Sequence, residues 1–338
     1  EIPALPTPPN PDRVAGMLIA LAVGDSLGNT SEGMRPGERN RRHGEIRGYL
    51  PNRYAGGKVI GLPTDDTQLS FWALEQILSD KRVDPGNISD RFTRGQIFGI
   101  GNSVRNFLMA RALGKSWEDA GQESAGNGAL MRVAPLILPS LVAGGTELAA
   151  DIALGSMITH NDSASLSACV AFGLMLRELL HMSGPPAADW WIDRYLSLAS
   201  RIETDTLYRS RSPHYSSFNG KLSDFVKAEA GRAVTDGTSV LEACESWYSG
   251  AYLLETVPSV LLILSRYAHD PEEALVRAVN DTVDNDTVAA IVGMAGGALH
   301  GRRGLPERWI TGVSGRTAAS DDGRVFELVD ECLVTFTR

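Results

Sequence analysis

Apolar residues recur three and four positions apart along most of this 338-residue chain, the spacing that places them on one face of an α-helix. No segment alternates apolar and polar residues convincingly, as a half-buried strand does, and no strands alternate with helices as in nucleotide-binding α/β domains. The composition, 43% hydrophobic and 22% charged, is that of an ordinary globular protein. The pattern predicts one all-α domain, in which 35–58 and 204–220 are loops. The predicted helices are 13–23, 68–79, 89–95, 102–113, 128–143, 146–159, 163–182, 189–202, 221–231, 238–247, 255–268, 271–279, 287–300 and 323–336.

The domain is expected to span residues 13–338, after a flexible arm at 1–12. The arm is rich in proline and lacks the apolar centre of a signal peptide. No stretch approaches the roughly 20 apolar residues that cross a bilayer. The net charge of −9 disfavours nucleic acid or an anionic membrane as the main partner. Cys169, Cys244 and Cys332 are widely separated and lack zinc-binding spacing, which favours reduced thiols in a cytoplasmic protein.

One predicted helix starts with a dense group of oxygen-bearing side chains. In Val283–His300, the residues Asp284, Asp286 and Thr287 precede the apolar period, which puts them in the first turn. Aspartate and threonine are common there because they cap free N–H groups and complement the helix dipole. Two carboxylates exceed what a cap requires, and crowded carboxylates repel one another unless a cation or a shared proton relieves them. Three glycines also disfavour this helix unless another element packs closely against it: Gly293, Gly296 and Gly297.

A second predicted helix begins in the same way. Thr64, Asp65, Asp66 and Thr67 precede another apolar period. If the two helix starts met in space, they would supply six hard oxygen ligands, a donor set that suits Mg²⁺ or Mn²⁺ better than Zn²⁺. The spacing alone leaves a metal site and a pair of acidic caps equally open.

Polar residues also gather where other predicted helices begin or end. The glycine-rich stretch 124–132 opens a helix whose free N–H groups can bind a phosphate. His160 follows another helix, where it is either a favourable C-terminal cation or a ligand contact. The turn 99–103, which includes Asn102, leads into a third helix. Each signal is weak by itself, because glycine turns and lone histidines are common.

The first helix is expected to stop at a pair of glycines. Gly24 and Gly28 permit backbone angles that end a helix, so the prediction leaves Asp25 and Glu32 in the loop that follows.

Taken in order, these segments resemble the ADP-ribosylglycohydrolase family, whose members remove ADP-ribose from modified protein side chains. The resemblance runs from about Arg13 to Gly304, and an ordered set of motifs is far rarer by chance than any one of them. It is carried by Gly24-Asp25-Ser26-Leu27-Gly28 with Glu32, Thr64-Asp65-Asp66-Thr67, Gly126-Asn127-Gly128 with Met131-Arg132, His160, Ser249-Gly250-Ala251-Tyr252-Leu253-Leu254-Glu255-Thr256, and Asp284-Asn285-Asp286-Thr287 leading to Ala298 and Gly301.

The resemblance implies a single compact orthogonal helical bundle with a binuclear metal site at its centre. Glu32 and Asp65 are the implied catalytic acids, and Glu32 is the mobile one. Asp286 is the implied bridge between the ions, and Tyr252 the residue that stacks on the adenosine side. The implied ligands of two Mg²⁺ or Mn²⁺ ions are Thr64, Asp65, Asp66, Asp284, Asp286 and Thr287. The implied diphosphate and ribose contacts are Asn102, Ser124, Gly126, Asn127, Gly128 and His160.

The implied activity is metal-dependent hydrolysis of the bond between ADP-ribose and a protein side chain, with an ADP-ribosylated protein and ADP-ribose as partners. Arginine-linked ADP-ribose is the first expectation because 252–256 and 126–128 resemble the bacterial type, while serine-linked and O-acetyl ADP-ribose stay open. One position departs from the family pattern. Many arginine-directed bacterial relatives carry an acid shortly before the Gly-Asn of the third loop, where this chain has Phe98-Gly99-Ile100-Gly101-Asn102. If that acid is catalytic in those relatives, its role falls here to Glu32 or Asp65, or the substrate differs.

The main alternative is a binding protein on the same scaffold. Such a protein would neutralise an ADP-ribosylating toxin by covering its active site, alone or in addition to hydrolysis, and the arm at 1–12 could carry that role. Neither this protein nor a purely structural one, like the lens crystallin that resembles the family, needs intact metal ligands, and here all the candidates are present. An unrelated Mg²⁺ phosphohydrolase would explain the ligands but not the order of the motifs.

Overall fold

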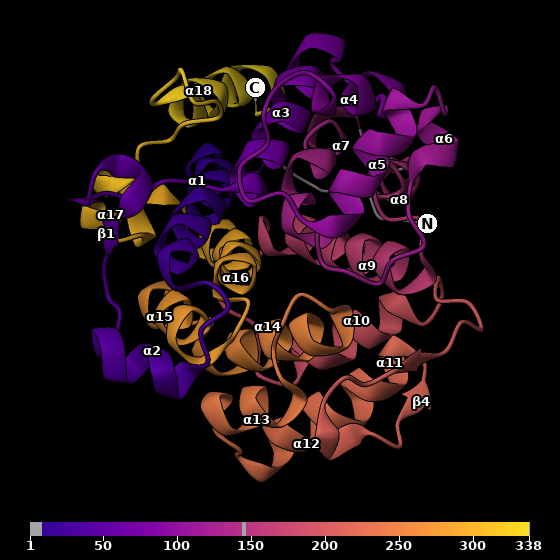
Figure 1. Ribbon diagram of the computed structural model, residues 1–338, viewed down its shortest axis with the longest axis vertical. Helices are drawn as coiled ribbons and strands as arrows, with labels where there is room; N and C mark the ends of the chain where they lie inside the picture. Colours follow the sequence, from indigo (N-terminus) through magenta and orange to yellow (C-terminus); the bar gives the residue numbers. More distant parts are fainter. Residues whose placement is uncertain (1–8, 144–146, 338) are drawn as a thin grey trace.

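The computed structural model describes residues 9–143 and 147–337, and most of them are helical, which confirms the all-α prediction (Figure 1). The first eight residues of the predicted arm at 1–12 lie outside the described part. Helix α1 begins at Pro11, where Asn10 caps it by accepting a hydrogen bond from the Asp12 N–H. The helices are α1 (Pro11–Gly28), α2 (Pro36–His43), α3 (Asp65–Asp80), α4 (Pro85–Phe92), α5 (Asn102–Ala112), α6 (Trp117–Ala120), α7 (Ser140–Ala143), α8 (Leu148–Met157), α9 (Ser163–Leu179), α10 (Trp190–Ala199), α11 (Leu222–Phe225), α12 (Gly231–Asp236), α13 (Val240–Trp247), α14 (Leu253–Tyr267), α15 (Pro271–Asp281), α16 (Asn285–His300), α17 (Glu307–Gly312) and α18 (Arg324–Phe336).

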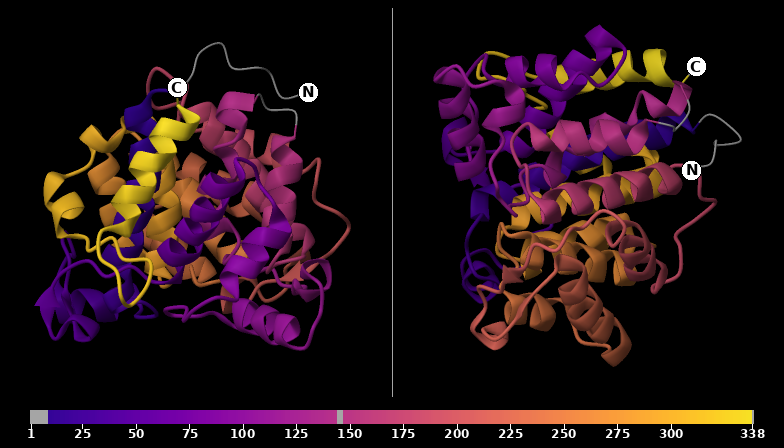
Figure 2. Two further views of the ribbon diagram at one scale, coloured as in Figure 1. Left: turned by 90° about the horizontal axis from the view of Figure 1, so that it is seen from above. Right: turned by 90° about the vertical axis from the view of Figure 1, so that its right-hand side faces the viewer.

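Two of these helices, α1 and α16, lie against each other at the centre of the bundle (Figure 1). Around α16 pack α15, α14, α9 and α3, while α18 packs on α1. The right-hand view of Figure 2 shows the helices in stacked layers, with α18 in one outer layer and α12 and α13 in the opposite one. The two halves of the chain therefore meet along the α1–α16 contact.

Glycines in both helices allow the backbones of α1 and α16 to touch. A Cβ atom at Gly24 would lie 2.2 Å from the carbonyl oxygen of Ala289, and one at Gly297 would lie 2.1 Å from that of Gly16. A Cβ atom at Gly28 would lie 2.4 Å from Cα of Asp286. The two helices run antiparallel, so the end of α1 lies beside the start of α16.

The prediction that Gly24 ends the first helix was wrong. Helix α1 continues to Gly28, and Asp25 is fully buried inside it. These glycines are required by the contact with α16 and not by a turn. Such a contact involves a segment far away in the sequence, so the local pattern cannot distinguish it from a helix stop.

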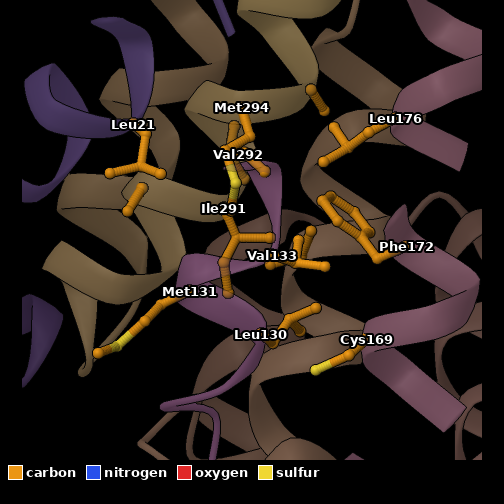
Figure 3. Close-up of a cluster of buried hydrophobic side chains, with 14 of the residues drawn as sticks. Leu21, Leu130, Met131, Val133, Cys169, Phe172, Leu176, Ile291, Val292 and Met294 are labelled. Atoms are coloured by element: carbon orange, nitrogen blue, oxygen red, sulfur yellow. The ribbon is translucent and has the colours of Figure 1, made fainter. Parts of the chain in front are cut away.

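The core is built where α16 faces α9 (Figure 3). A chain segment made of two 3-10 turns, Leu130–Arg132 and Ala134–Ile137, passes between the two helices and contributes to the same cluster. Each large apolar side chain buried here stabilises the fold by about 1.5–3 kcal/mol relative to an exposed one. The labelled members are Leu21, Leu130, Met131, Val133, Cys169, Phe172, Leu176, Ile291, Val292 and Met294, all buried.

The predicted helix at 128–143 was also wrong in type. The chain there forms the two 3-10 turns and the single turn of α7, because Pro135 and Pro139 lack the N–H groups that a continuous α-helix would use. Both 3-10 turns are buried. The apolar pattern correctly indicated that this stretch is buried, but it wrongly predicted a continuous α-helix.

The stretch 35–58 was predicted as a loop but contains α2. Pro36 occupies the first helical position, and basic residues fill the last turn, as the helix dipole favours. The buried residues of this helix are Pro36 and Arg39, so it shows no apolar period. The rest of the stretch includes the short antiparallel pair β1 (Pro51–Asn52) and β2 (Lys58–Val59).

The other predicted loop, 204–220, contains no α-helix. It holds the antiparallel pair β3 (Tyr208–Arg209) and β4 (Asn219–Gly220) and one 3-10 turn. Within the described ranges, no helix is both long and apolar enough to cross a membrane.

Replacing Gly297 with alanine is expected to lower the free energy of unfolding by about 1–3 kcal/mol, because the new Cβ atom would overlap the backbone of Gly16. The next glycine along provides the control. A Cβ atom at Gly296 would meet only Pro271, at 3.6 Å, so Gly296→Ala should be neutral or stabilise the fold by up to about 1 kcal/mol through helix propensity. Urea unfolding measures both variants. Equal stabilities would contradict a backbone contact between α1 and α16.

Candidate functional site

A pocket of about 310 Å³ opens where the starts of α3 and α16 converge beside the end of α1. Asp65 and Asp66 reach it from α3, Asp284 and Asp286 from α16, and Glu32 from the segment after α1. The two helix starts distinguished in the sequence do meet in space. Of the predicted site residues, the pocket is lined by Glu32, Asp65, Asp66, Asn102, Ser124, Gly126, Asn127, Gly128, His160, Asp284, Asp286 and Thr287.

Two predicted site residues, Thr64 and Tyr252, are not among the lining residues. The Thr64 hydroxyl donates a hydrogen bond of 2.7 Å to Asp25. Tyr252 pairs through its backbone with Gly126, at the edge of the glycine-rich loop. A wider hollow between α3 and α18, lined by Glu75, Glu331 and Val334 among others, holds none of the predicted residues.

The carboxylates of the pocket form two overlapping groups. In one group, oxygens of Asp25, Asp66 and Asp286 all lie within 4.8 Å of one another. Oxygens of Glu32, Asp284 and Asp286 form the other group at the same spacing. Asp286 belongs to both, so its carboxylate lies between them.

Asp25, which the sequence analysis did not assign to the site, fixes the start of α3. Its carboxylate accepts hydrogen bonds from the backbone N–H groups of Thr64 at 2.8 Å and Thr67 at 3.1 Å, and from both threonine hydroxyls. An acid from α1 thus caps the N-terminus of α3. One signal was present in the sequence: Asp25 is the one acid in the long apolar run of the first helix, after Arg13.

On the other side of the pocket, Asp284 is joined to the glycine-rich loop. The Asn127 side-chain amide donates to Asp284 at 2.6 Å and to the Thr256 hydroxyl at 3.0 Å. Thr256 in turn donates to the carbonyl oxygen of Gly250. These bonds hold the loop, the start of α14 and the start of α16 together.

Crowding and burial weaken the acidity of these groups. Burial, followed by repulsion from Asp284 and Asp25, raises the pKa of Glu32 to about 7. Burial raises the pKa of Asp284 to about 6, although the hydrogen bond from Asn127 opposes this shift. The pKa values of four more acids are raised, chiefly by burial: Asp25, Asp65, Asp66 and Asp286.

The donor set fits a hard divalent cation. All members of both groups offer carboxylate oxygens, the ligands that Mg²⁺ and Mn²⁺ prefer. Oδ1 of Asp66 is buried without a hydrogen-bond partner, and leaving such an atom unpaired costs about 1–3 kcal/mol. A cation would satisfy this oxygen and relieve the repulsion between the acids.

Another part of the pocket lining is shaped by glycines and a histidine. A Cβ atom at Gly128 would lie 2.8 Å from Cε1 of His160, so only glycine allows the imidazole this position. Burial lowers the pKa of His160 to about 3, so the ring is neutral. The Ser124 hydroxyl accepts hydrogen bonds from the Ser103 hydroxyl at 2.8 Å and from the Gly126 N–H at 3.2 Å.

Arg211 is the one positively charged side chain among the described pocket-lining residues, and the sequence analysis did not identify it. Its guanidinium forms two hydrogen bonds, of 2.8 and 2.7 Å, with the buried carboxylate of Glu255. It also lies 5.0 Å from the centre of the Tyr252 ring. Arg211 belongs to the loop 204–220, which shows no periodic pattern, whereas Glu255 and Tyr252 belong to a recognised motif.

The helical fold and the acidic, glycine-lined pocket agree with a match to a known family of enzymes. The sequence model of the family described as ADP-ribosylglycohydrolase matches residues 6–336. The chain therefore belongs to the ADP-ribosylglycohydrolase family, and it is an enzyme of that class.

Named relatives agree with this assignment. The chain is 26% identical to the ADP-ribosyl-[dinitrogen reductase] glycohydrolase of Rhodospirillum rubrum, with 89% of this chain and 90% of the relative covered. It is 27% identical to the ADP-ribosylarginine hydrolase Tri1 of Pseudomonas putida (strain GB-1), with 90% of this chain and 74% of the relative covered. A solved structure, an ADP-ribosylglycohydrolase-related protein complex, matches with a TM-score of 0.68 and 27% identity over 96% of this chain and 97% of its own.

The raised pKa values predict how stability depends on pH and on divalent cations. Each acid binds its proton more tightly in the folded than in the unfolded chain, so the cation-free protein should lose stability as pH rises from about 4 through about 7. Cation binding requires deprotonated ligands and has the opposite pH dependence. A chelator should therefore lower the melting temperature much more at about pH 7.5 than at about pH 5. The same chelator effect at both pH values would contradict a crowded acidic site.

Proposed function

We propose that this enzyme hydrolyses the bond between C1″ of ADP-ribose and a protein side chain, with two Mg²⁺ or Mn²⁺ ions held by the acidic groups. One observation carries the proposal: two carboxylate groups share Asp286 in a pocket that Gly126, Asn127 and Gly128 of the glycine-rich loop also line. The carboxylates suit a pair of cations, and the N–H groups of the loop suit a diphosphate. ADP-ribose carries both a diphosphate and a reacting ribose, which match these two parts of the pocket.

The ions would be held by the carboxylates that line the pocket, with Asp286 between them and Thr287 beside it. Bound there, they would orient the ribose hydroxyls and lower the pKa of a water molecule. Asp25 contributes by fixing Thr64 and the start of α3, so that Asp65 and Asp66 keep their places. Asp25 also offers an oxygen to one of the two groups and is a further candidate ligand.

Glu32 is the proposed general acid–base group. Hydrolysis forms a bond from a water oxygen to C1″, breaks the bond from C1″ to the leaving atom and moves a proton from the water to that atom. A pKa near 7 lets one carboxyl group accept and release this proton at neutral pH. Glu32 lies at the rim of the pocket, where the residue is partly exposed while its carboxylate lies close to the buried Asp284 and Asp286. It is followed by Gly33, whose φ of +75° favours glycine.

The ADP part of the substrate would lie along the glycine-rich wall. N–H groups near Gly126 and Gly128, the Ser124 hydroxyl and Asn102 supply donors to the diphosphate, and neutral His160 supplies one more polar contact. Arg211, oriented by Glu255 and lying over one face of the Tyr252 ring, would offer its remaining N–H groups to the diphosphate, and Tyr252 would stack on the adenosine side.

Arginine-linked ADP-ribose is the proposed substrate. The Pseudomonas putida relative is named for it, and the acidic end of the pocket complements a guanidinium leaving group. The stretch 98–102 lacks the acid that many arginine-directed relatives carry shortly before the Gly-Asn, so serine-linked and O-acetyl ADP-ribose belong in the same test. A toxin-neutralising role stays a prediction, because residues 1–8 of the arm at 1–12 that could carry it lie outside the described residues.

Asp286→Ala is expected to abolish hydrolysis and the thermal stabilisation by Mg²⁺, because Asp286 contributes to both carboxylate groups. The assay incubates metal-loaded protein with arginine-, serine- and acetyl-linked ADP-ribose and follows free ADP-ribose. Asp281→Asn is the matched control, since Asp281 pairs with Arg277 on α15 and does not line the pocket. Wild-type turnover by the Asp286→Ala protein would refute the metal assignment.

Glu32→Gln keeps the side-chain shape and removes the titrating carboxyl group. Turnover should fall by roughly 10² or more, while affinity for ADP-ribose stays within a few fold, because other groups bind the diphosphate. Glu38→Gln, an exposed acid on α2, should leave both unchanged. Calorimetry with ADP-ribose beside the hydrolysis assay measures the two quantities. Unchanged turnover would make Glu32 a solvated loop acid, and loss of affinity would make it a ligand.

A further inference from the structure

Arg39 is the buried member of a helix that is otherwise largely exposed. Helix α2 buries only Pro36 and Arg39, and the Arg39 side chain is fully inaccessible to solvent. Burying a guanidinium is costly unless all of its N–H groups are hydrogen-bonded. The hydrogen bonds of Arg39 therefore indicate the structural role of α2.

The guanidinium of Arg39 joins two segments of the active site. On one side it donates to the segment around Glu32: Nε binds the Ser31 hydroxyl at 3.0 Å, and Nη2 binds the carbonyl oxygens of Met34 at 2.9 Å and Ser31 at 3.3 Å. The other side contacts the turn that precedes Asp284. There Nη1 binds the carbonyl oxygens of Thr282 at 2.6 Å and Asn280 at 3.2 Å, and Nη2 reaches that of Val283 at 3.5 Å.

Arg39 makes no ion pair with any of the described residues, and its hydrogen-bond acceptors are carbonyl and hydroxyl oxygens. If Arg39 served only to neutralise a buried acid, it would be bonded to a carboxylate and not to several backbone carbonyl oxygens. Burial lowers the pKa of Arg39 to about 10, which still leaves it charged at neutral pH. The planar fork of arginine can bond in several directions at once, which the compact ammonium of lysine cannot.

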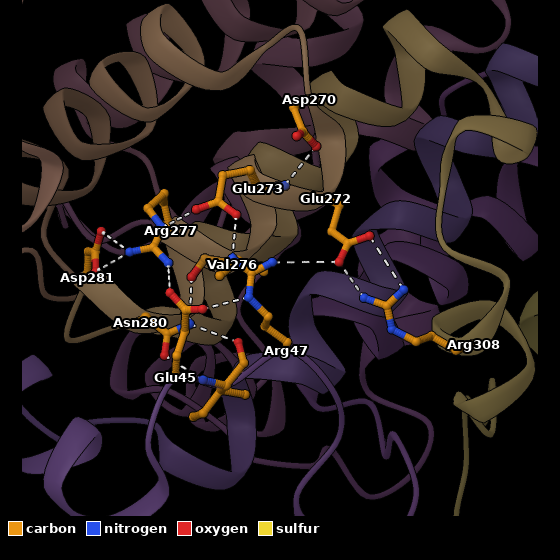
Figure 4. A network of polar contacts seen from close by, with 11 residues as sticks. Glu45, Arg47, Asp270, Glu272, Glu273, Val276, Arg277, Asn280, Asp281 and Arg308 are labelled. Atoms are coloured by element: carbon orange, nitrogen blue, oxygen red, sulfur yellow. Dashed lines mark hydrogen bonds and ion pairs between the residues drawn. The ribbon is translucent and has the colours of Figure 1, made fainter.

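The helix that carries Arg39 is itself anchored to α15 (Figure 4). Asn280 accepts from the N–H of Ile46 at 2.8 Å and donates to its carbonyl oxygen at 2.9 Å, so it holds the chain just after α2. Around this clamp lies a network of ion pairs formed by Glu45, Arg47, Glu272, Glu273, Arg277, Asp281 and Arg308. The helix that carries Arg39 is therefore held in place on α15.

Other bonds tie the same two segments together. Asn285, the first residue of α16, donates its side-chain amide to the Ser31 hydroxyl at 3.0 Å. The N–H of Gly33 donates to the carbonyl oxygen of Val283 at 3.0 Å. Ser31 thus receives both Arg39 and Asn285, directly beside Glu32.

We propose that Arg39 is a positioning residue that holds the Glu32 segment on the turn before Asp284, so that the Glu32 carboxyl faces Asp284 and Asp286. The inference rests on the proposed role of Glu32 in proton transfer. It limits the movement of Glu32: the segment is fixed on both sides of the acid, so the side chain has more freedom than the backbone. Misplacement of a reacting group by about 1 Å can cost roughly 10² in rate.

A double-mutant cycle tests whether Arg39 acts through Glu32. We expect Arg39→Met to lower kcat by roughly 10² and Arg39→Lys by roughly tenfold, with KM and the Kd of ADP-ribose within a few fold of wild type. Combined with Glu32→Gln, neither change should lower kcat further, because the group that Arg39 positions is already lost.

Two more variants make the result decisive. Ser31→Ala removes one acceptor of Arg39 and leaves the backbone acceptors in place, and it should show a smaller loss of kcat that also disappears in the Glu32→Gln background. Arg266→Lys is the control, since Arg266 also donates to carbonyl oxygens, those of Ala233 and Thr238, but far from the pocket. It should lower the melting temperature without changing kcat.

The outcomes separate the two proposals. Losses of Arg39→Lys or Ser31→Ala that multiply with that of Glu32→Gln would overturn the positioning role, as would wild-type kcat in both variants. If Glu32→Gln itself retained wild-type turnover, the proposed function of Glu32 would fail, whatever the Arg39 variants did.

Discussion

The contact between the backbones of α1 and α16 determines where every other part of the site lies. Glycines bring the two helices closer than side chains would allow, and their antiparallel order places the end of α1 beside the start of α16. Asp25 comes from the first helix and Glu32 from the segment that follows it, while Asp284 and Asp286 come from the start of the second. A shift of one helix along the other would separate these groups, although most of the core would remain buried.

Concentrating so many acids in one pocket requires compensation, and the fold provides part of it. The N-termini of α3 and α16 both point their positive dipole ends at the carboxylates. Arg39 is hydrogen-bonded to the Glu32 segment, and Arg211 lines the pocket. The raised pKa values indicate that this compensation is incomplete, which leaves protons or divalent cations to balance the remaining charge. The negative charge that the protein does not compensate is thus what favours cations in the pocket.

The sequence predicted the features that local patterns encode. The helical period indicated an all-α fold, the paired acids at Asp65 and Asp284 marked the two helix starts that converge, and the glycines of α16 indicated a close packing partner. Features that depend on distant contacts were missed. Gly24 was read as a helix stop because its partner Ala289 cannot be inferred locally, and Arg211 gave no signal because its loop has no period.

Helix α2 shows a different limit of the same reasoning. Periodicity detects apolar faces, but this helix is fixed by one arginine whose acceptors are backbone carbonyls. Every residue has a backbone carbonyl group, so the side chains near Thr282 or Met34 do not indicate that Arg39 binds there. A buried polar anchor of this kind becomes visible only in three dimensions.

The antiparallel pairing of α1 with α16 also affects how the chain is made. Helix α1 is among the first segments synthesised, and its partner α16 follows about 260 residues later. At roughly 5–20 residues per second, α1 waits on the order of 10–60 s with its apolar surface uncovered. During that interval the acidic part of the pocket cannot be complete, because Asp65 and Asp66 are made early and Asp284 and Asp286 late. Newly made protein should therefore depend on chaperones until α16 has been added, and a chain truncated before Asn285 should accumulate as an inactive, aggregation-prone species.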